Sequence, residues 1–595
     1  MREERQINSG AVNMKEFYSE AERVEVKPAI GKKEIEKALA LLNRYKQGKA
    51  NLENEVVENE LWYKLRHWEV MRQNAKEKEL PEPSSAWLFN SLAQKHADAM
   101  DNFPEPNVLP REQSDEEEAK KLSAILPVVL EHCDFENTYS ENWWEKLKHG
   151  TSVYGVFWNS EKENGLGDID IVPIDLLNIF WEPGIRDVQE SSNLFIVTLK
   201  DREQLRREYP KIPEGSVQGG IAIKEYIYDD TVDTSDKVAV IDWYYKVKDG
   251  SGTHLHYCKF SCGEVLFASE NEEEYRESGW YEHGKYPVVF DTLFPEKGTC
   301  CGFGYISICK DPQMYIDKLS KYILQNAFMA SKIRYMVSDG SGINEDEFKD
   351  WSNDVVHCSG NINEDKAQQI KPQPLSGIYY NILQFKTDEL KETSSNRDFS
   401  QGSTASGVTA AAAIAALQEA GSKTSRDMIA ASYRAYTTLC YMVIDLMCQF
   451  YDEERAFRIT GEGDGDKYIA FSNAGIREQT VPPAYEGAEE SVRRPVFDIK
   501  IKAQKKNPFS RMSQNELAKE LLGLGFFAPQ NAHQALCAIE LMEFEGKDKV
   551  TAKIKEGATL QSQINEMQMQ MQQMAAMIEV LRSGEGAMQG DKVQV

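Results

Sequence analysis

Several features are missing from this sequence of 595 residues, and each absence excludes a class of protein. The sequence has no uninterrupted window of about 18 apolar residues, the length typical of a membrane-spanning helix, so no membrane partner is expected. The residues that follow Met1 lack the apolar run of a signal peptide. The ten cysteines show no regular spacing, which is typical of buried, reduced thiols in a cytosol-like compartment.

A complete nucleotide-binding loop is also missing. The nearest match is Gly421-Ser422-Lys423-Thr424, in which a serine separates the glycine from the lysine and the preceding residues predict a helix. A phosphate-binding loop needs G-x-x-x-x-G-K-[ST] at a turn from a strand into a helix. No cluster of carboxylates suited to metal-assisted hydrolysis stands out either. The sequence therefore predicts a protein that is not an enzyme and has no cofactor, and it disfavours an ATPase or a nuclease.

Positive charge is scarce as well. The chain carries 69 Lys and Arg against 96 Asp and Glu, a net charge of -27, which argues against a general nucleic-acid binder with a basic face. The charge leaves open a protein that lets DNA slide past without holding it. Phosphate contacts supply most non-specific affinity for DNA, and an acidic surface does not make them. A hydrophobic content of 41% indicates a folded chain, and the length of 595 residues predicts about three to four domains.

The N-terminal half combines helical and β-rich patterns, so we expect the α+β class. Apolar periodicity predicts helices at residues 34–45 and 53–71. The run Asp115-Glu116-Glu117-Glu118 indicates the solvated first turn of another helix, since carboxylates complement the helix dipole there. Short strands are predicted at residues 152–158 and 169–172, and Asp249-Gly250-Ser251-Gly252 predicts a hairpin turn.

One group of residues in this region could bind zinc. His254, His256 and Cys258 alternate along a predicted strand, which places them on one face, and Cys262 follows four residues later. Structural zinc sites usually gather their ligands from two separated pairs, whereas this group lies on one strand. We therefore favour an ordinary hairpin strand and predict no metal.

The central segment predicts two long helices with a small globular insert between them. Asp311-Pro312 suggests a helix start, an N-cap acceptor followed by proline at the first position, and the apolar stripe continues to Ser331. A compact α/β insert is expected from Ile333 to Pro374, and a second helix from Ile378 to Lys391.

A Gly/Ser/Thr-rich loop then leads into a very long helix, expected from Thr409 to about Glu454 with a kink at Gly421-Ser422. Its apolar stripe indicates a buried face and consists of Ile429, Tyr433, Tyr436, Cys440, Val443, Met447 and Phe450. Residues 493–511 carry seven basic side chains against Asp498 alone. This segment could touch DNA, but the alternation of apolar and basic residues around Ile499 favours the solvent-exposed face of a strand.

The last segment predicts a helix that needs partners. An almost uncharged heptad seam comprises Leu560, Ile564, Met567, Met571, Met574, Ile578 and Leu581. Such a seam cannot bury itself alone, so we expect bundling with neighbouring helices. A disordered extension is the alternative, supported by the Gly- and Ser-containing end at residues 583–591.

The order of these parts resembles the portal (head–tail connector) protein of tailed bacteriophages, from about Gly150 to Glu556. The resemblance rests on the Gly150–Trp158 strand, the Ile169–Phe180 region ending in Trp181-Glu182-Pro183, and the helix–insert–helix unit of residues 311–391. Its most specific part is Ser406-Gly407-Val408-Thr409-Ala410, leading to Leu417-Gln418-Glu419-Ala420-Gly421 and then Ser425-Arg426-Asp427; Asn507-Pro508 also fits.

The resemblance implies a subunit with a wing, stem helices, a clip, a tunnel loop and a helical crown, which assembles as a ring. We divide the chain into an N-terminal helical arm (1–84), a wing (85–300), a first stem helix (301–332), a clip (333–377), a second stem helix (378–395), a tunnel loop (396–408), a long kinked wing helix (409–455), wing strands (456–506), crown helices (507–556) and a heptad helix with a disordered tail (557–595).

The same resemblance implies which residues would face the DNA. Candidates in the tunnel loop are Arg397, Phe399, Ser400, Gln401, Ser403, Thr404 and Ser406, whose hydroxyls could touch phosphates weakly without fixing a register. The stem offers Lys318, Lys321, Lys332 and Arg334 as point charges, although each could equally be a solvated surface residue.

Expected partners are further copies of the chain in a dodecameric ring, double-stranded DNA in transit, the terminase packaging motor, capsid and scaffold proteins, and a neck adaptor protein. The resemblance places the protein in the virion, assembled in the host cytoplasm, with a part in genome packaging and ejection. The alternative is a phage structural oligomerisation or scaffold-like protein without a DNA channel.

Overall fold

The computed structural model describes residues 29–72, 81–210, 237–248, 250, 252–331, 334–337, 342–350, 352, 354–360, 367–370, 375–395, 423–461, 465–481, 491–505, 519–520, 522–523, 535–536, 539 and 547–589. These residues divide into two units, one formed by 1–100 and 104–503 and the other by 101–103 and 504–595. Helices and strands are both plentiful, which confirms the α+β class. No helix in the described part of the chain is long and apolar enough to cross a membrane.

A five-stranded antiparallel sheet with the order β4-β5-β6-β7-β8 forms one core of the first unit. Its strands are β4 (Ile179–Trp181), β5 (Asn193–Asp201), β6 (Lys237–Lys248), β7 (Thr253–Ser261) and β8 (Glu264–Ala268). β6 and β7 pair up to Lys248 and Thr253, on either side of the expected hairpin turn. The long helix α1 (Lys32–Tyr63) packs on this sheet through Ile35, Ala38, Leu42 and Tyr45, whose spacing places them on one helix face.

The prediction of two N-terminal helices separated near residue 48 was wrong. α1 runs without a break to Tyr63, and only the short α2 (His67–Met71) is separate. Gly48, which lies between the two expected helices, packs against Pro183, where a Cβ would come within 2.5 Å of the proline ring. Gly48 therefore lets the helix approach the end of β4 closely, which outweighs its low helix propensity.

A second sheet of three antiparallel strands has the order β3-β2-β9. It contains β2 (Thr151–Asn159), β3 (Asp168–Ile174) and β9 (Val288–Thr292), and α5 (Phe135–His149) and α11 (Lys423–Phe450) pack against it. The predicted apolar stripe of α11 is buried here at Tyr436, Cys440, Val443 and Met447. α11 ends at Phe450, four residues before the expected end, while the expected kink at Gly421-Ser422 lies outside the described residues.

Buried polar contacts tie this second core together. The Lys146 ammonium on α5 lies 2.6 Å from a carboxylate oxygen of Asp291 on β9, and the Ser432 hydroxyl on α11 donates to the other oxygen at 2.6 Å. All three side chains are buried, so the charges are removed from water but remain paired. Breaking such a pair leaves an uncompensated buried charge, which is strongly destabilising.

The rest of the first unit consists of helices and two-stranded sheets: α3 (Trp87–Asp101), α4 (Glu116–His132), α6 (Arg202–Glu208), and the pairs β1 (Asn102–Pro110) with β18 (Phe497–Lys505), β10 (Phe294–Pro295) with β11 (Gly302–Phe303), β14 (Arg455–Gly461) with β15 (Gly465–Phe471), and β16 (Gln479–Val481) with β17 (Ser491–Arg493). The acidic run does open α4, but Asp115 is buried and accepts hydrogen bonds from Arg493. The expected solvated turn is therefore partly a buried contact.

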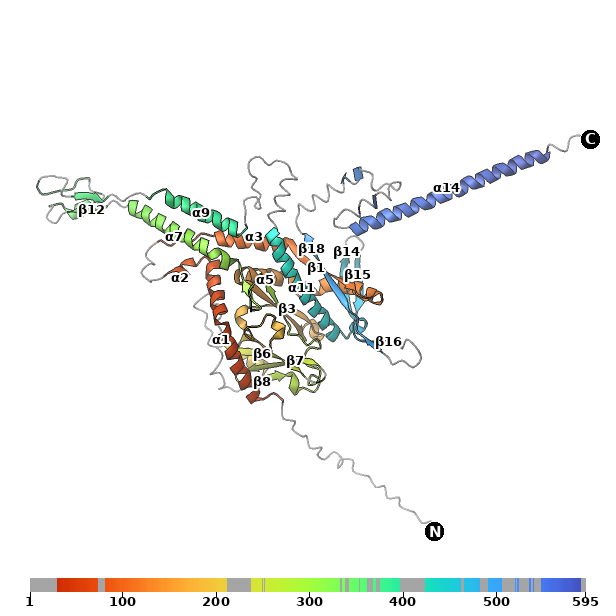
Figure 1. The fold of residues 1–595 in the computed structure, drawn as a ribbon, viewed down its shortest axis with the longest axis horizontal. Coiled ribbons are helices and arrows are strands. Elements are labelled where there is room, and N and C mark those ends of the chain that lie inside the picture. The colour runs from red at the N-terminus through yellow and green to blue at the C-terminus, as the bar shows by residue number, and fades with distance from the viewer. Residues whose placement is uncertain are drawn as a thin grey trace, which may run out of the picture. The chain divides into compact units, whose positions relative to one another are not determined.

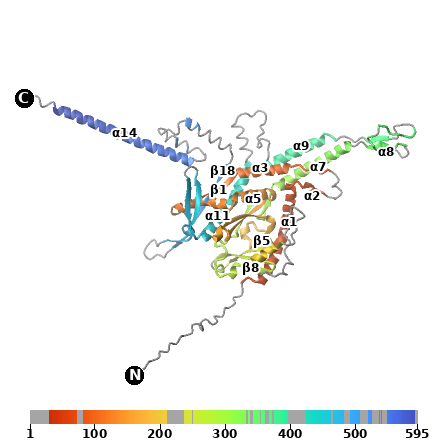
Figure 2. The ribbon, with the colours of Figure 1, turned by 180° about the vertical axis from the view of Figure 1, so that it is seen from behind.

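A pair of antiparallel helices leaves the body of this unit. α7 (Tyr305–Ser331) and α9 (Ile378–Thr393) pack side by side, and beyond them lie β12 (Arg334–Val337), α8 (Glu345–Lys349) and β13 (Ala367–Ile370), with β12 and β13 antiparallel (Figures 1 and 2). α9 begins where the sequence predicts. The start of α7 differs from the prediction: the helix begins six residues before Asp311 and carries Pro312 in its interior. Buried Tyr305, Ile306 and Cys309 anchor this extra turn and offset the cost of an internal proline.

The second unit contains a small apolar cluster and the C-terminal helix. Ala535, Ile539 and Ile554 are buried together with Leu536 and Val550 partly buried beside them. The helix α14 (Lys547–Gln589) includes the whole predicted heptad seam and extends through most of the glycine-containing end that favoured disorder. Within it, Ile564, Met567, Met571, Met574 and Ile578 are exposed.

Candidate assembly surfaces and the root of the helical pair

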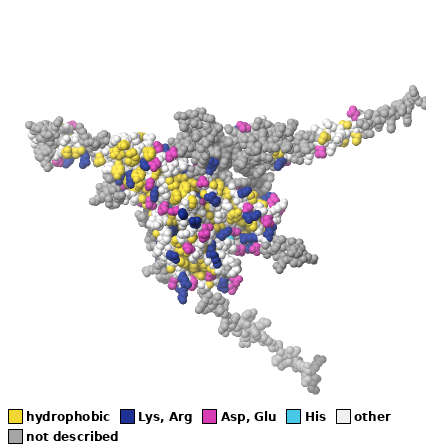
Figure 3. Space-filling view, in the orientation of Figure 1, with side chains coloured by type: hydrophobic (Ala, Val, Ile, Leu, Met, Phe, Trp, Pro, Cys, Tyr) yellow, Lys and Arg dark blue, Asp and Glu magenta, His cyan; other side chains and the backbone are white. Residues whose placement is uncertain are grey.

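The outer parts of α7 and α9 expose large apolar side chains to solvent. On α7, Tyr315, Tyr322 and Met329 are exposed at intervals of seven residues, which places them on one face of the helix. On α9, Ile378, Ile382 and Phe385 follow the i, i+4, i+7 pattern of one face and are exposed too, with Phe385 at 65%. Hydrophobic side chains gather over this helical pair in the space-filling view (Figure 3). A contiguous apolar surface of this kind marks an interaction site.

The expected stem charges lie in different environments. Lys318 is half-buried on α7, and Arg334 is exposed on β12. Lys321 is only 6% exposed, with its ammonium 4.4 Å from the centre of the Trp68 ring, so in the single chain it faces the arm instead of solvent. Lys332 lies outside the described residues.

The expected tunnel-loop residues also lie outside the described part of the chain: Arg397, Phe399, Ser400, Gln401, Ser403, Thr404 and Ser406. The described chain stops at Ser395, just after α9, and resumes at Lys423 with α11. Their suggested role in the channel therefore stays a prediction.

The predicted basic segment is partly occupied by internal ion pairs. Arg493 lies 3.0 Å from Glu112 and also bonds Asp115, and Arg494 lies 3.4 Å from Asp445. Lys500 is exposed on β18. Both arginines hold acidic groups of the same unit, which supports the strand interpretation over a DNA-binding patch.

The residues of the zinc hypothesis are not brought together. Cys258 is buried in the apolar cluster beneath α1, while His256 lies 3.2 Å from the Ser269 hydroxyl through its Nδ1 atom. Cys262 lies in the turn after β7, at a positive φ of 53°. Among the described residues, no three of these side chains bring their ligand atoms within 4.8 Å of one another, and both His256 and Cys258 are buried on the strand.

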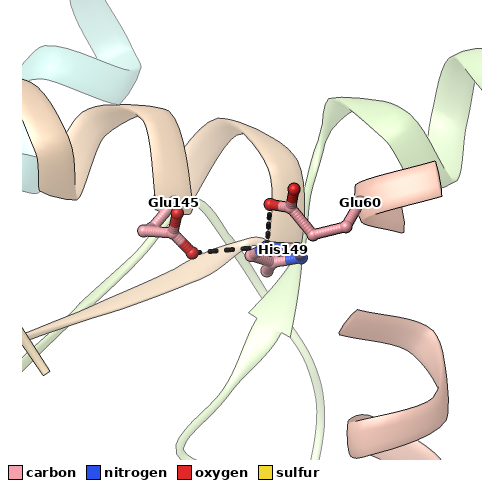
Figure 4. A group of neighbouring side chains, drawn as sticks. All are labelled: Glu60, Glu145 and His149. Atoms are coloured by element: carbon pink, nitrogen blue, oxygen red, sulfur yellow. Dashed lines mark hydrogen bonds and ion pairs between the residues drawn. The ribbon is translucent and has the colours of Figure 1, made fainter. Parts of the chain in front are cut away.

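A compact ionic cluster joins α1 to α5 instead. His149 Nε2 lies 3.2 Å from Glu60 Oε1 and 3.3 Å from Glu145 Oε2, so the imidazole stands between two carboxylates (Figure 4). Lys148 bonds the same two carboxylates, at 2.7 Å for Glu145. In the described part of the chain, this is the one group of three whose potential ligand atoms all lie within 4.8 Å.

The charges of this cluster balance without a metal ion. Burial opposes ionisation, but hydrogen bonds from His149 and the Lys148 ammonium outweigh it and lower the pKa of Glu60 to about 2. The pKa of Lys148 rises to about 12, because the attraction of Glu145 and Glu60 exceeds its burial penalty. The pKa of His149 is raised for the same reason, against its own burial. Lys148 already supplies a cation to both carboxylates, so we interpret the cluster as a structural joint.

A second buried cluster fixes the root of α7. Asp317 Oδ2 lies 2.5 Å from His67 Nδ1, while Asp317 Oδ1 accepts from the Ser85 amide, the Ser85 hydroxyl and the Gln313 side-chain amide at 3.1, 2.9 and 3.0 Å. The other nitrogen of His67 lies 3.0 Å from the Trp62 carbonyl oxygen. His67, Asp317 and Gln313 are fully buried. Sequence patterns did not single out His67 or Asp317, because the two are 250 residues apart.

The comparisons with known proteins identify the family. The sequence model of the phage P22-like portal protein family matches residues 93–594, most of the chain. No curated protein matches the chain. The matched region contains the helical pair with its insert, α11 and the C-terminal helix. The chain belongs to the phage P22-like portal protein family.

Proposed function

We propose that the chain assembles into a ring, expected to be a dodecamer, whose axis is the DNA channel at one vertex of the phage capsid. In this proposal α7 and α9 form the stem, residues 333–377 the clip, residues 396–408 the tunnel loop and residues 507–556 the crown. The clip docks the terminase motor during packaging and later the neck adaptor and tail. Membership of the portal family supports a structural, virion-associated role.

The observation that carries the proposal is the exposed apolar surface of α7 and α9. Tyr322 is 58% and Phe328 55% exposed on α7, and Phe385 is exposed on α9. A helical hairpin that leaves apolar side chains on both helices in water is incomplete by itself. In a closed ring each copy has a neighbour on both sides, so such contacts repeat head to tail until the ring closes.

The decisive experiment is a native mass measurement of the purified protein, combined with negative-stain images. A closed ring with an axial hole is expected. Filaments, compact dimers or monomers at micromolar concentration would instead favour the alternative, a structural or scaffold-like protein without a channel.

A matched pair of variants tests the surface that carries this proposal. Tyr322→Glu with Phe328→Glu should prevent ring formation, because each places a carboxylate in the contact. The control is Tyr468→Glu on β15, an equally aromatic and more exposed position outside the helical pair, which should still form rings. If both proteins form rings, α7 is not an assembly surface.

The loop assignment needs its own test. Deleting residues 399–406 should leave the ring assembled while packaging or retention of DNA falls, because a segment rich in Gly and Ser contributes little to a core. A deletion variant that cannot form rings would show that the segment is structural.

A further inference from the structure

At the joint between the N-terminal arm and the root of α7, both ring nitrogens of a buried histidine face hydrogen-bond acceptors. One ring nitrogen of His67 faces the Asp317 carboxylate and the other faces the Trp62 carbonyl oxygen. Both partners are acceptors, so each nitrogen must donate a proton to make its bond. As long as Asp317 is ionised, a neutral imidazole has only one N–H and would leave one of these buried contacts as lone pair against lone pair.

The surroundings of Asp317 indicate which member of the pair carries the proton. Asp317 Oδ1 already accepts three hydrogen bonds, from two donors of Ser85 and one of Gln313. A carboxylate that accepts several hydrogen bonds is favoured in its ionised form. The extra proton of the pair therefore belongs to His67, which makes an imidazolium–carboxylate contact with both side chains fully buried.

We propose that His67 and Asp317 form a proton-dependent latch that fastens the arm to α7. Loss of the proton removes the charge attraction and one hydrogen bond at the same time, so the latch is tight when His67 is protonated and loosens as pH rises. This inference concerns one chain and goes beyond the proposed function, because it holds whether or not the chain forms a ring.

The latch lies near the point where α7 changes from buried to exposed. Asp317 lies one turn before Lys321, the last buried residue of α7, and every residue from 322 to 331 is half-buried or exposed. The same stretch of α7 is held at two further points: Gln313 Oε1 accepts from the Leu88 amide of α3 at 3.1 Å, and the Lys321 ammonium lies over the Trp68 ring of the arm. The latch thus stands where the exposed half of α7 leaves the body.

The charged and titratable groups around His67 come from every element packed there. Asp317 and Lys321 belong to α7, and the Trp62 ring of α1 stacks on the imidazole with centroids 4.6 Å apart. Nearby pairs are Lys64 with Glu60, Arg66 with Glu69, and Arg72 with Glu82. Among these described groups, Asp317 is the carboxylate in direct contact with the His67 ring, so it dominates the charge that the imidazolium meets.

Hydrogen–deuterium exchange of the full-length protein tests the latch. Amide protection of residues 62–72 and 313–321 is measured at about pH 6 and about pH 9, on either side of the usual histidine range, and corrected for intrinsic exchange rates. We expect protection to fall about tenfold at the higher pH, the size of one hydrogen bond to a charged group. In His67→Gln, protection should be low and equal at both values.

Two further variants keep the result interpretable. Asp317→Asn preserves shape but removes the charge partner, and it should abolish the pH dependence even if His67→Gln folds poorly. His254→Gln alters a histidine on β7 whose Nδ1 lies 3.4 Å from the Ser278 carbonyl oxygen, and it should keep the full pH dependence of the unmodified protein. Equal protection of the unmodified protein at both pH values, or a pH dependence that survives in both His67→Gln and Asp317→Asn, would overturn the latch.

Discussion

Helices α11 and α14 have similar apolar patterns but different environments. Val443 and Met447 on α11 are completely buried against the strands of the same unit. On α14 the seam positions Met567 and Met571 are also four residues apart, yet Met571 is 62% exposed. A seam predicts that a face will be buried, but not whether the partner lies in the same chain. Our prediction for α14 is that other copies of the chain cover this face, since a seam of methionines tolerates imprecise packing.

The sharpest test of this difference places the same charge on both helices. Val443→Asp on α11 should lower the free energy of unfolding by about 4 kcal/mol, because it buries an unpaired carboxylate. Met571→Asp on α14 should change the unfolding of the chain by less than about 0.5 kcal/mol, because the position is already in water. Denaturant unfolding measured for both variants checks this prediction. Equal losses in the two variants would mean that the seam of α14 is buried within its own chain.

A second prediction concerns charge on the two long helices at either end of the chain. Glu60 on α1 has a pKa of about 2 against an ordinary value of 4.5. Its contribution to stability, about 3 kcal/mol, is therefore complete above pH 4.5 and is lost as pH falls from there towards 2. Glu60→Gln should remove this acid-sensitive part of the stability curve. The control, Glu566→Gln on the exposed part of α14, should leave the curve unchanged.

An acid titration of unfolding in which Glu60→Gln keeps the full acid sensitivity would contradict this assignment. It would mean that the cluster with Lys148 and His149 does not control the folded state. Because Glu145 shares both partners, the stability losses caused by Glu60→Gln and by Glu145→Gln are not expected to add in the double variant.

The third prediction removes the exposed seam. Truncation after Gly557 should preserve rings but lower their melting temperature by a few degrees if the copies of α14 bundle. A free helix of this kind is marginal in water, so its order should depend on neighbours. Unchanged melting, together with protease cleavage between residues 561 and 577 in intact rings, would leave the bundle unsupported.

The sequence predicted features that depend on local periodicity and missed those that depend on distant contacts. The stripe of α11 and the start of α9 follow from spacing alone. The need for a glycine at position 48 of α1 comes from Pro183, which lies against it, and the early start of α7 goes with the burial of Tyr305. No local pattern can report such contacts. The latch is the extreme case, because His67 and Asp317 become meaningful only when the fold brings them together.

The smallest effect on stability is expected at the stem charges. Reversing Lys318, Lys332 and Arg334 to Glu together should change the melting temperature very little, since Lys318 is half-buried and Arg334 is exposed. Lys321 is kept, because its ammonium packs on Trp68 and its loss would disturb the arm. The expected change is functional: DNA packaged per particle should fall, and the deficit should shrink at higher salt, where charge contacts to phosphate weaken.

The matched control for this last variant reverses a lysine away from the helical pair. Lys297 lies in the turn between β10 and β11 and is exposed. Lys297→Glu therefore makes one charge reversal of the same kind outside the stem. If the triple variant packages as well as the control at every salt concentration, these side chains are ordinary solvated residues. The apolar surface of α7 and α9 would then serve assembly alone, and contact with DNA would have to come from the loop at residues 396–408.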